Sequence, residues 1–400
     1  MARRDYWLLS AYYAVYFGIL GVWIPYWSLY LDALGHGAEA IGTLLAISLG
    51  CKVLGPPVWG TLADNGSRRQ VIRLTSLASF LAFCLFFLDS GFATLAVAMA
   101  TFSIFQSGPM VLVEVSTLEA VKRTGGDYGR VRLWGSIGFI LSAFSLGRVI
   151  GDRGPGIILW VIALLLLLGV LVALALPESG EAPGNKREGK KAGGWMETGK
   201  CLASIPGLGW FYLCSLMMQM SHGAYYGFLS IHLAGEGFSP TAIGFLWALG
   251  VAAEVVVMFH ARWLGLRLGY STLWLGSVLF AALRWGIFAV TLWWPLLVLA
   301  QIFHAFTFGT FHIASVERLF EGVPAGIRAT AQAWYAALSF GIGLGLGTWL
   351  SGYLFGPIGA NRLFAVMAAL AGLAFLAGRR SLAALSPTLP PPLEASPRHG

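Results

Sequence analysis

Long apolar runs recur along almost the whole chain of 400 residues, and they constrain the fold more than any other feature. A bilayer core of ~30 Å needs about 20 consecutive apolar residues in helical form. Backbone groups that face lipid must find hydrogen-bond partners within the protein, which favours helices. We therefore expect an all-α membrane protein with twelve transmembrane helices. The predicted spans are residues 6–31, 40–62, 71–88, 92–115, 131–150, 157–176, 208–233, 243–263, 273–292, 295–316, 329–354 and 358–377.

The composition argues against a water-soluble fold. Apolar residues make up 57% of the chain and charged residues 11%, against roughly 45–50% and about 25% in soluble domains. A soluble protein of this size would have too few polar side chains to cover its surface. The chain also lacks a hydrophilic stretch large enough for an ATPase domain.

One hydrophilic segment, 177–200, lies near the middle of the chain with six apolar runs on either side. It is rich in Gly, Pro and charge and has no apolar periodicity, which is typical of a solvated connector. We therefore divide the chain into a six-helix bundle at 1–176, a cytoplasmic connector at 177–205 and a second six-helix bundle at 206–380. The Pro-rich end, 381–400, is predicted to be a disordered cytoplasmic tail.

The formal net charge of +8 reports orientation rather than a nucleic-acid partner. If twelve spans cross the bilayer, most of the 26 Lys and Arg residues fall in loops and termini on one side. The positive-inside rule assigns that side to the cytoplasm. We expect both termini in the cytoplasm, in a bacterial-type cytoplasmic membrane, and a monomer.

No pattern typical of an enzyme stands out. The four cysteines, Cys51, Cys84, Cys201 and Cys214, have neither metal-ligand nor disulfide spacing, and we expect them to pack. No phosphate-binding loop, metal-ligand cluster or Ser-His-Asp pattern is apparent. We predict neither enzymatic activity nor a metal or other cofactor, with protons as the coupling ion.

An internal repeat appears when the chain is shifted by about 200 residues. Residues 40–42 and 242–244 both read Ala-Ile-Gly, preceded by Gly35 and Gly237, and Trp134 falls on Trp334. Six helices duplicated in the same orientation are the architecture of the major facilitator superfamily. The repeat predicts two pseudo-symmetric bundles.

The loop after the second run adds a motif that resembles this superfamily's loop signature. Residues 60–69 read GTLADNGSRR, with a Gly, an Asp four residues later and a closing basic pair. Ser67 and Asn65 depart from the pattern. The resemblance implies a lock that gates the inner ends of the helices. We also assign two arginines at the start of the fifth run to this lock. The alternative is that these are ordinary basic residues of cytoplasmic loops, as the positive-inside rule expects. The gating candidates are Gly60, Asp64, Arg68, Arg69, Arg130 and Arg132.

Longer stretches resemble the phenylpropionate permease branch of the superfamily. They lie at 25–28, 127–136, 224–228, 250–255 and 284–287. The resemblance covers most of the chain apart from the connector and the tail. It implies proton-linked uptake, with aromatic acids as the named substrates of that branch.

Polar residues at bilayer depth are the main site candidates. A charge there costs roughly 2.5–3.5 kcal/mol on insertion scales and marks a functional position by default. The candidates within apolar runs are Lys52, Glu114, Glu254, Arg284, His222, His304 and His312. Most belong to the second half, where we expect the proton machinery.

Glu254 is the first candidate for proton binding, because its neighbours in the run are apolar. Arg284 on the next helix would couple protonation to conformation if its distance from Glu254 alternated. The alternative is a fixed Glu254–Arg284 ion pair that only joins helices. His304 and His312, eight residues apart, could relay a proton or could be interhelical hydrogen bonders. An acid, an Arg and a His in spans eight to ten also resemble the lactose-permease arrangement.

An anionic substrate would need a cation, which Lys52 or Arg284 could supply. Aromatic side chains and a few placed polar groups are typical of small-molecule pockets, and we expect this pocket to take an aromatic carboxylate. The remaining substrate-binding candidates are Tyr16, Glu114, His222, Tyr225, Tyr226 and Trp285. Glu114 could instead pair with Arg130 or Arg132. We expect Trp23, Tyr26 and Trp27 at the membrane–water interface.

Two other transport functions stay open. One is a sugar or nucleoside proton symporter, as relatives in such branches differ in substrate. The other is a proton-driven drug efflux antiporter. That class carries a Gly-Pro ending within the fifth span, whereas here Gly154-Pro155 lies beyond it.

Overall fold

The computed structural model describes residues 1, 3–177 and 202–385. Within these ranges the chain is almost entirely helical and contains no strand. Most of the predicted connector, 177–205, lies outside the described residues. So does most of the predicted tail, 381–400, although the last helix continues to Leu385.

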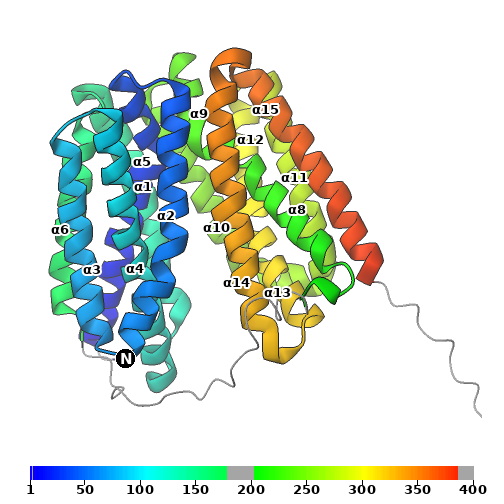
Figure 1. The fold of residues 1–400 in the computed structure, drawn as a ribbon, viewed down its shortest axis with the longest axis horizontal. Coiled ribbons are helices and arrows are strands. Elements are labelled where there is room, and N and C mark those ends of the chain that lie inside the picture. The colour runs from blue at the N-terminus through cyan, green and yellow to red at the C-terminus, as the bar shows by residue number, and fades with distance from the viewer. Residues whose placement is uncertain (2, 178–201, 386–400) are drawn as a thin grey trace, which may run out of the picture.

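The first bundle contains six long helices joined by short turns (Figure 1). They are α1 (Arg3–Ala33), α2 (Ala38–Asp64), α3 (Arg68–Phe83) with its 3-10 extension η1 (Cys84–Phe87), α4 (Phe92–Thr124), α5 (Tyr128–Arg153) and α6 (Ile157–Ala175). Side-chain caps fix two of the starts. The Ser67 hydroxyl accepts from the Gln70 N–H at the start of α3, and the Asp127 carboxylate accepts from the Gly129 N–H at the start of α5.

The second bundle contains more, shorter elements, because several of its membrane-length helices are interrupted. They are α8 (Leu208–Ser221), α9 (Gly223–Gly235), α10 (Pro240–Leu268), α11 (Tyr270–Val290), α12 (Trp294–His304), the π-helix η2 (Ala305–Thr310), α13 (Phe311–Gly322), the 3-10 helix η3 (Ala325–Ile327), α14 (Arg328–Ala336), the π-helix η4 (Ala337–Gly343) and α15 (Leu344–Leu385). A π-helix has a wider turn than an α-helix and often marks a functional position.

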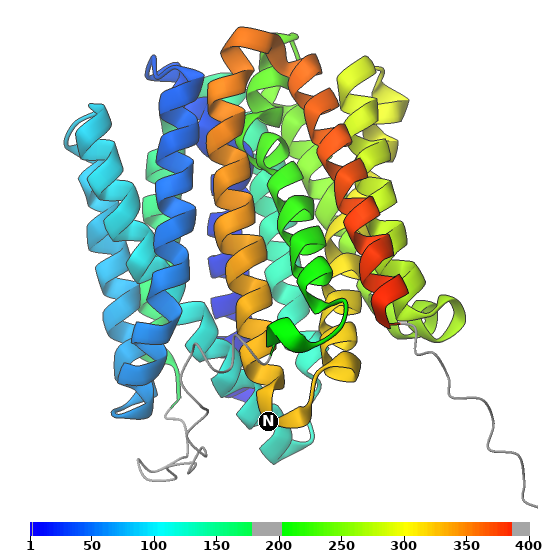
Figure 2. The same cartoon turned by 45° about the vertical axis from the view of Figure 1, so that its right-hand side comes forward.

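Ten helical stretches of the described chain are long and apolar enough to cross a membrane. One of them, Ala325–Ala384, holds the last two predicted spans, which separate at Gly359 with a φ of 77°. Figure 2 shows the reversal there, where the orange helix turns into the red one. The seventh predicted span is present as α8 and α9, which are divided at His222. The twelve predicted helices and the all-α membrane fold are therefore confirmed.

The repeated glycines lie where the two bundles meet. The principal contacts between bundles join α5 to α10 and α2 to α15. A Cβ added at Gly42 of α2 would lie 2.8 Å from the Cα atom of Gly352 in α15. Its counterpart in the repeat, Gly244 of α10, packs in the same way against the Ala143 carbonyl of α5. The internal repeat thus produces two equivalent close crossings.

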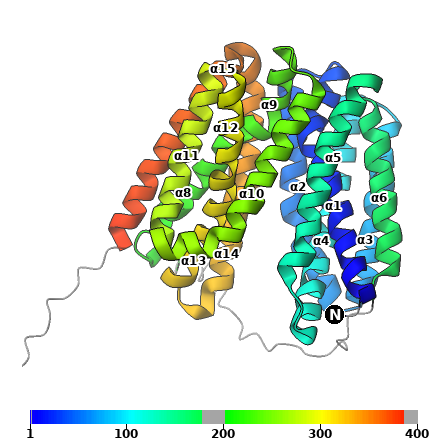
Figure 3. The same cartoon turned by 180° about the vertical axis from the view of Figure 1, so that it is seen from behind.

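These crossings are close to the turns that end at Gly37 and Ser239, at the end of the molecule opposite to the N-terminus. We call this end the turn face, and the end that carries residue 1 and the α2–α3 turn the terminal face. The bundles lie together near the turn face, and their ribbons diverge towards the terminal face (Figures 1 and 3). Gly35 and Gly237, with φ of 86° and 84°, make equivalent tight turns there.

Candidate functional site

Arg284 of α11 is the centre of a polar network inside the second bundle. Its side chain is completely buried, with 0% of its surface exposed. Its Nη2 donates to the Oε1 atom of Gln301 at 3.2 Å, and its Nη1 lies 3.2 Å from the Nδ1 atom of His304. Nη1 also donates to the Thr307 hydroxyl at 3.4 Å. All three acceptors are neutral, so a full positive charge is buried with no carboxylate in ion-pair contact among the described residues.

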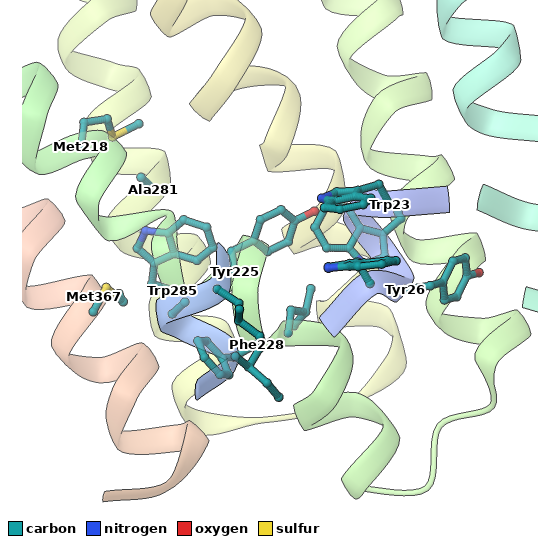
Figure 4. Packing of buried hydrophobic residues seen from close by; sticks show 14 of the residues in the cluster. Trp23, Tyr26, Met218, Tyr225, Phe228, Ala281, Trp285 and Met367 are labelled. Atoms are coloured by element: carbon teal, nitrogen blue, oxygen red, sulfur yellow. The ribbon is translucent and has the colours of Figure 1, made fainter. Parts of the chain in front are cut away.

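Aromatic rings enclose the same guanidinium. Its central carbon lies 4.0 Å from the ring centroid of Tyr225 and 4.8 Å from that of Trp285. Such cation–π contacts stabilise a desolvated arginine, since the ring faces are electron-rich. The Tyr225 hydroxyl donates to the Oε1 atom of Gln301 at 2.9 Å. Figure 4 shows Tyr225, Trp285 and Phe228 within the aromatic packing around this site.

His304 links Arg284 to Glu254. Its Nε2 atom lies 4.0 Å from the Glu254 carboxylate, on the other side of the ring from the Arg284 contact. A guanidinium can only donate, so Nδ1 of His304 accepts and Nε2 carries the proton in the neutral ring. The N–H at Nε2 is therefore directed towards the Glu254 carboxylate. The order is Glu254, His304, Arg284, and the alternative of a fixed Glu254–Arg284 ion pair is wrong in this conformation.

Small residues let these helices approach each other. A Cβ added at Gly250 of α10 would lie 3.2 Å from the Gln301 Oε1 atom and 3.4 Å from the ring of His304. A Cβ added at Gly309, in the π-helix η2, would lie 3.2 Å from the Cγ atom of Glu254. The two glycines bring α10 against α12 and η2, which is why Glu254 reaches His304.

Arg132 of α5 belongs to the first bundle but is electrostatically coupled to Glu254 in the second. Its guanidinium carbon is stacked 4.0 Å from the ring centroid of Phe17. The positive charge of Arg132, a residue predicted to be a gate, therefore acts on the predicted proton site from the other bundle. Movement of one bundle against the other would change the separation between Arg132 and Glu254.

The other predicted proton and substrate residues of the second bundle have different surroundings. His312 lies outside the Arg284 network, with its Nδ1 atom 3.4 Å from the Tyr335 hydroxyl. His222 is buried, with Nδ1 2.8 Å from the Met218 carbonyl oxygen and its ring edge-on to Trp285. Tyr226 contacts Tyr225 and His304, with ring centroids 5.1 and 6.5 Å away. Tyr226 is thus part of the site. His222 packs against Trp285, which in turn lines the site.

The predicted interfacial position of Trp23, Tyr26 and Trp27 is wrong. All three side chains are at most 6% exposed. Trp23 and Trp27 are stacked with their ring centroids 4.0 Å apart, and the Tyr26 hydroxyl donates to the Ala143 carbonyl of α5 at 2.6 Å. They point towards neighbouring helices, as the labelled Trp23 and Tyr26 in Figure 4 illustrate, so helix packing decides their position.

Lys52 of α2 is the predicted substrate-binding cation of the first bundle. Its Nζ atom lies 5.9 Å from the ring centroid of Trp23. Tyr16 of α1 uses its hydroxyl inside the first bundle, where it donates to the Gln106 carbonyl at 3.2 Å. Glu114 accepts from the Tyr128 hydroxyl at 2.7 Å, so the alternative in which it pairs with Arg130 or Arg132 is wrong in this conformation.

Two residues of the predicted gating lock on the terminal face, Arg68 and Arg130, pair with residues of the first bundle. Arg68 forms a two-pronged ion pair with Glu119 of α4, with N–O distances of 2.5 and 3.0 Å. Asp64 and Gly60 lie on the last turns of α2, where Asp64 is exposed. Arg130 pairs with Asp127 of its own helix at 3.5 Å. The Arg68–Glu119 contact joins α3 to α4 within one bundle, while Arg69 lies beside Glu119 in a small pocket.

Two members of the site were missed in the sequence. Gln301 and Thr307 are neutral residues in an apolar run and attract no attention by charge. Gln301 precedes His304 by three residues, so both lie on one face of α12. The three-residue spacing from His304 could therefore have identified Gln301 in the sequence. Thr307 falls in the π-helix, which no sequence pattern indicated.

Comparison with known proteins agrees with this architecture. The chain matches the MFS_1 like family over residues 6–366. An Escherichia coli (strain K12) protein named "Probable 3-phenylpropionic acid transporter" is 30% identical over 370 residues, which cover 91% of this chain and 94% of that protein. The maltose permease of Geobacillus stearothermophilus is 28% identical over 375 residues, covering 91% and 92%. The crystal structure of the nucleoside transporter NupG has a TM-score of 0.82 at 19% identity, covering 96% of this chain and 99% of that one.

The fold and the family together define a multi-pass membrane transporter with the major facilitator fold, and not an enzyme. The chain belongs to the MFS_1 like family. The predicted resemblance to the phenylpropionate permease branch is confirmed by the similarity to the Escherichia coli protein.

Proposed function

We propose that the chain is a proton-coupled symporter that imports a small aromatic carboxylate by alternating access. The observation that carries this proposal is the Arg284 guanidinium, which is fully buried among neutral acceptors and connected to Glu254 only through His304. A buried cation of this kind is stabilised by an anion, and a substrate carboxylate would supply one.

Charge balance provides the coupling. While Glu254 is ionised, its negative charge offsets Arg284 through His304 and attracts Arg132 from the other bundle. Once Glu254 binds a proton, the site has a net positive charge and favours a carboxylate. Proton and anion therefore bind together with little net charge, which is the requirement for crossing a low-dielectric layer. By linkage, each ligand raises the affinity for the other.

The side chains around Arg284 favour a substrate whose carboxylate is attached to an aromatic ring. Tyr225, Tyr226, Trp247, Trp285 and Phe288 form one continuous group of rings beside Arg284. Rings of this kind attract an aromatic substrate through stacking and edge-on contacts. The name of the Escherichia coli relative, which specifies 3-phenylpropionic acid, supports the same class.

The conformation and charge suggest an orientation. The bundles are packed at the turn face, and most basic loop residues lie on the terminal face. Under the positive-inside rule the terminal face is cytoplasmic, with both termini, and the membrane is a bacterial cytoplasmic membrane. In this orientation the chain is closed to the outside. We also propose that it acts as a monomer.

A sugar or nucleoside symporter is the second candidate, because the maltose permease and NupG are similar to this chain. A neutral substrate would leave the charge of Arg284 without an anion, which is why we rank it lower. A proton-driven efflux antiporter would require the reverse response to a proton gradient.

Uptake by proteoliposomes tests these candidates together. Purified chain is reconstituted, and labelled 3-phenylpropionate, maltose and uridine are each offered outside at neutral pH or at acid pH. Symport predicts that 3-phenylpropionate accumulates when the outside is acid and that a protonophore abolishes accumulation. Accumulation of maltose or uridine alone would favour the second candidate, and accumulation driven by an acid interior would favour antiport.

A further inference from the structure

Gln301 holds an unusual place in the buried network. Its Oε1 atom accepts from two donors at once, the Tyr225 hydroxyl at 2.9 Å and Nη2 of Arg284 at 3.2 Å. The side chain is 0% exposed, and its Nε2 atom has no hydrogen-bond partner among the described residues. An amide oriented with its oxygen towards two donors is the arrangement that the hydrogen-bond chemistry requires.

The two donors together form a receptor for a carboxylate oxygen. A guanidinium binds carboxylates through parallel N–H groups, and such charge-assisted bonds are roughly twice as strong as neutral ones. The Nε atom of Arg284 also lacks a partner among the residues that the structure describes. The Nε–H group of Arg284 can therefore still donate to a ligand while the Gln301 amide accepts from Nη2.

We propose that Gln301 is a placeholder for the substrate carboxylate. Its Oε1 atom lies where one oxygen of the substrate binds, between Arg284 and the Tyr225 hydroxyl, and the amide is displaced when the substrate arrives. This inference rests on the proposed function, because it assumes a carboxylate substrate at Arg284. It assigns Gln301 a positioning and selectivity role, since the residue aligns the empty site and selects for anions.

The neutrality of Gln301 is what makes displacement possible. A carboxylate substrate replaces a bond between the Arg284 cation and a neutral amide oxygen with a bond between two opposite charges, so the exchange is favourable. A neutral alcohol forms a bond no stronger than the amide already does, so it is excluded. A permanent carboxylate at position 301 would bind Arg284 itself and block the substrate.

Two substitutions in the full-length chain give opposite results under this proposal. Gln301→Glu supplies an internal anion, and binding of 3-phenylpropionate should weaken at least about tenfold, or 1.4 kcal/mol. Gln301→Leu removes the competing acceptor without adding charge, and binding should be unchanged or up to about fivefold tighter, by the same relation between affinity and free energy. The neutral analogue 3-phenylpropan-1-ol should bind neither the unmodified chain nor Gln301→Glu, but it should gain measurable binding in Gln301→Leu, where no amide competes for Arg284.

The measurement is equilibrium binding of labelled 3-phenylpropionate to purified protein in nanodiscs, with thermal unfolding of each variant as the folding control. A purely structural role for Gln301 predicts weaker binding in both variants, and that result would overturn the proposal. So would a Gln301→Glu chain that binds like the unmodified one. If Gln301→Glu does not fold, Gln301→Leu decides alone, because a tenfold loss there contradicts displacement. An unmodified chain that binds no carboxylate overturns the proposed function itself.

Discussion

Gly42 of α2 and Gly352 of α15 pack backbone against backbone across the boundary between the two bundles. A Cβ added at Gly42 would lie 2.8 Å from the Gly352 Cα atom, and one added at Gly352 would lie 2.9 Å from the Gly42 Cα atom. Further along α2, a Cβ added at Gly50 would meet nothing within 4 Å. The tight contact is therefore local to the turn face, and α2 itself provides a matched control.

Gly42→Ala should destabilise the closed turn face, because its methyl group meets backbone atoms that cannot move without separating the helices. Overpacking of this kind costs about 1–3 kcal/mol. Gly50→Ala should change stability by no more than about 0.5 kcal/mol. Thermal unfolding of both purified variants measures the difference. Equal melting temperatures would show that the α2–α15 crossing tolerates an extra methyl group.

The Arg68–Glu119 ion pair predicts a change in stability without a change in transport, because both residues belong to the first bundle. Glu119→Gln should lower stability by up to about 1 kcal/mol, as the side chains are partly exposed at 17% and 35%. The exchanged pair Arg68→Glu/Glu119→Arg should restore part of it. Uptake by proteoliposomes should stay at the unmodified rate in all variants. Loss of uptake at unchanged stability would instead assign the pair to the gate.

Arg284→Lys tests whether the planar guanidinium is required. Lysine keeps the charge but loses the paired N–H groups and the stacking on Tyr225. Binding of 3-phenylpropionate should weaken at least about tenfold. Arg262→Lys, at an exposed position of α10, is the matched control and should bind as the unmodified chain does. Equal affinities for the two variants would mean that Arg284 does not hold the carboxylate.

Affinity for the substrate should depend on pH with a definite sign. Because protonation of Glu254 exposes the charge of Arg284, 3-phenylpropionate should bind more tightly as the pH falls through the titration of Glu254. His304 contacts this carboxyl directly, Arg132 acts on it electrostatically from the first bundle, and Arg284 lies on the far side of His304. Glu254→Gln should bind with high affinity at every pH. Dissociation constants of both chains across a pH series provide the test; a pH-dependent affinity that persists in Glu254→Gln would assign the titration elsewhere.

The sequence predicted the helices well because the length and apolarity of a membrane span are local properties. The repeat of Ala40-Ile41-Gly42 at 242–244 also predicted the paired bundles, and both glycines lie at the bundle boundary. The break at His222 and the π-helix η2 were not predictable in this way. They depend on how neighbouring helices satisfy the backbone rather than on any local composition.

The site was predicted only in part. Polar residues within apolar runs identified Glu254, Arg284 and His304, which the structure brings together. Their order could not be inferred, because it depends on the register of η2 and on the approach allowed by Gly250. The burial of Trp23 and Trp27 was missed for a similar reason. An aromatic ring suits both a lipid–water boundary and a helix interface, and only packing decides between them.

Glu254→Gln in proteoliposomes shows whether a proton on Glu254 couples substrate movement to the proton gradient. The amide mimics the protonated carboxyl, so exchange of labelled for unlabelled 3-phenylpropionate should continue. Accumulation driven by an acid exterior should be lost in the same vesicles. Accumulation by Glu254→Gln to the level of the unmodified chain would show that Glu254 does not couple transport to protons.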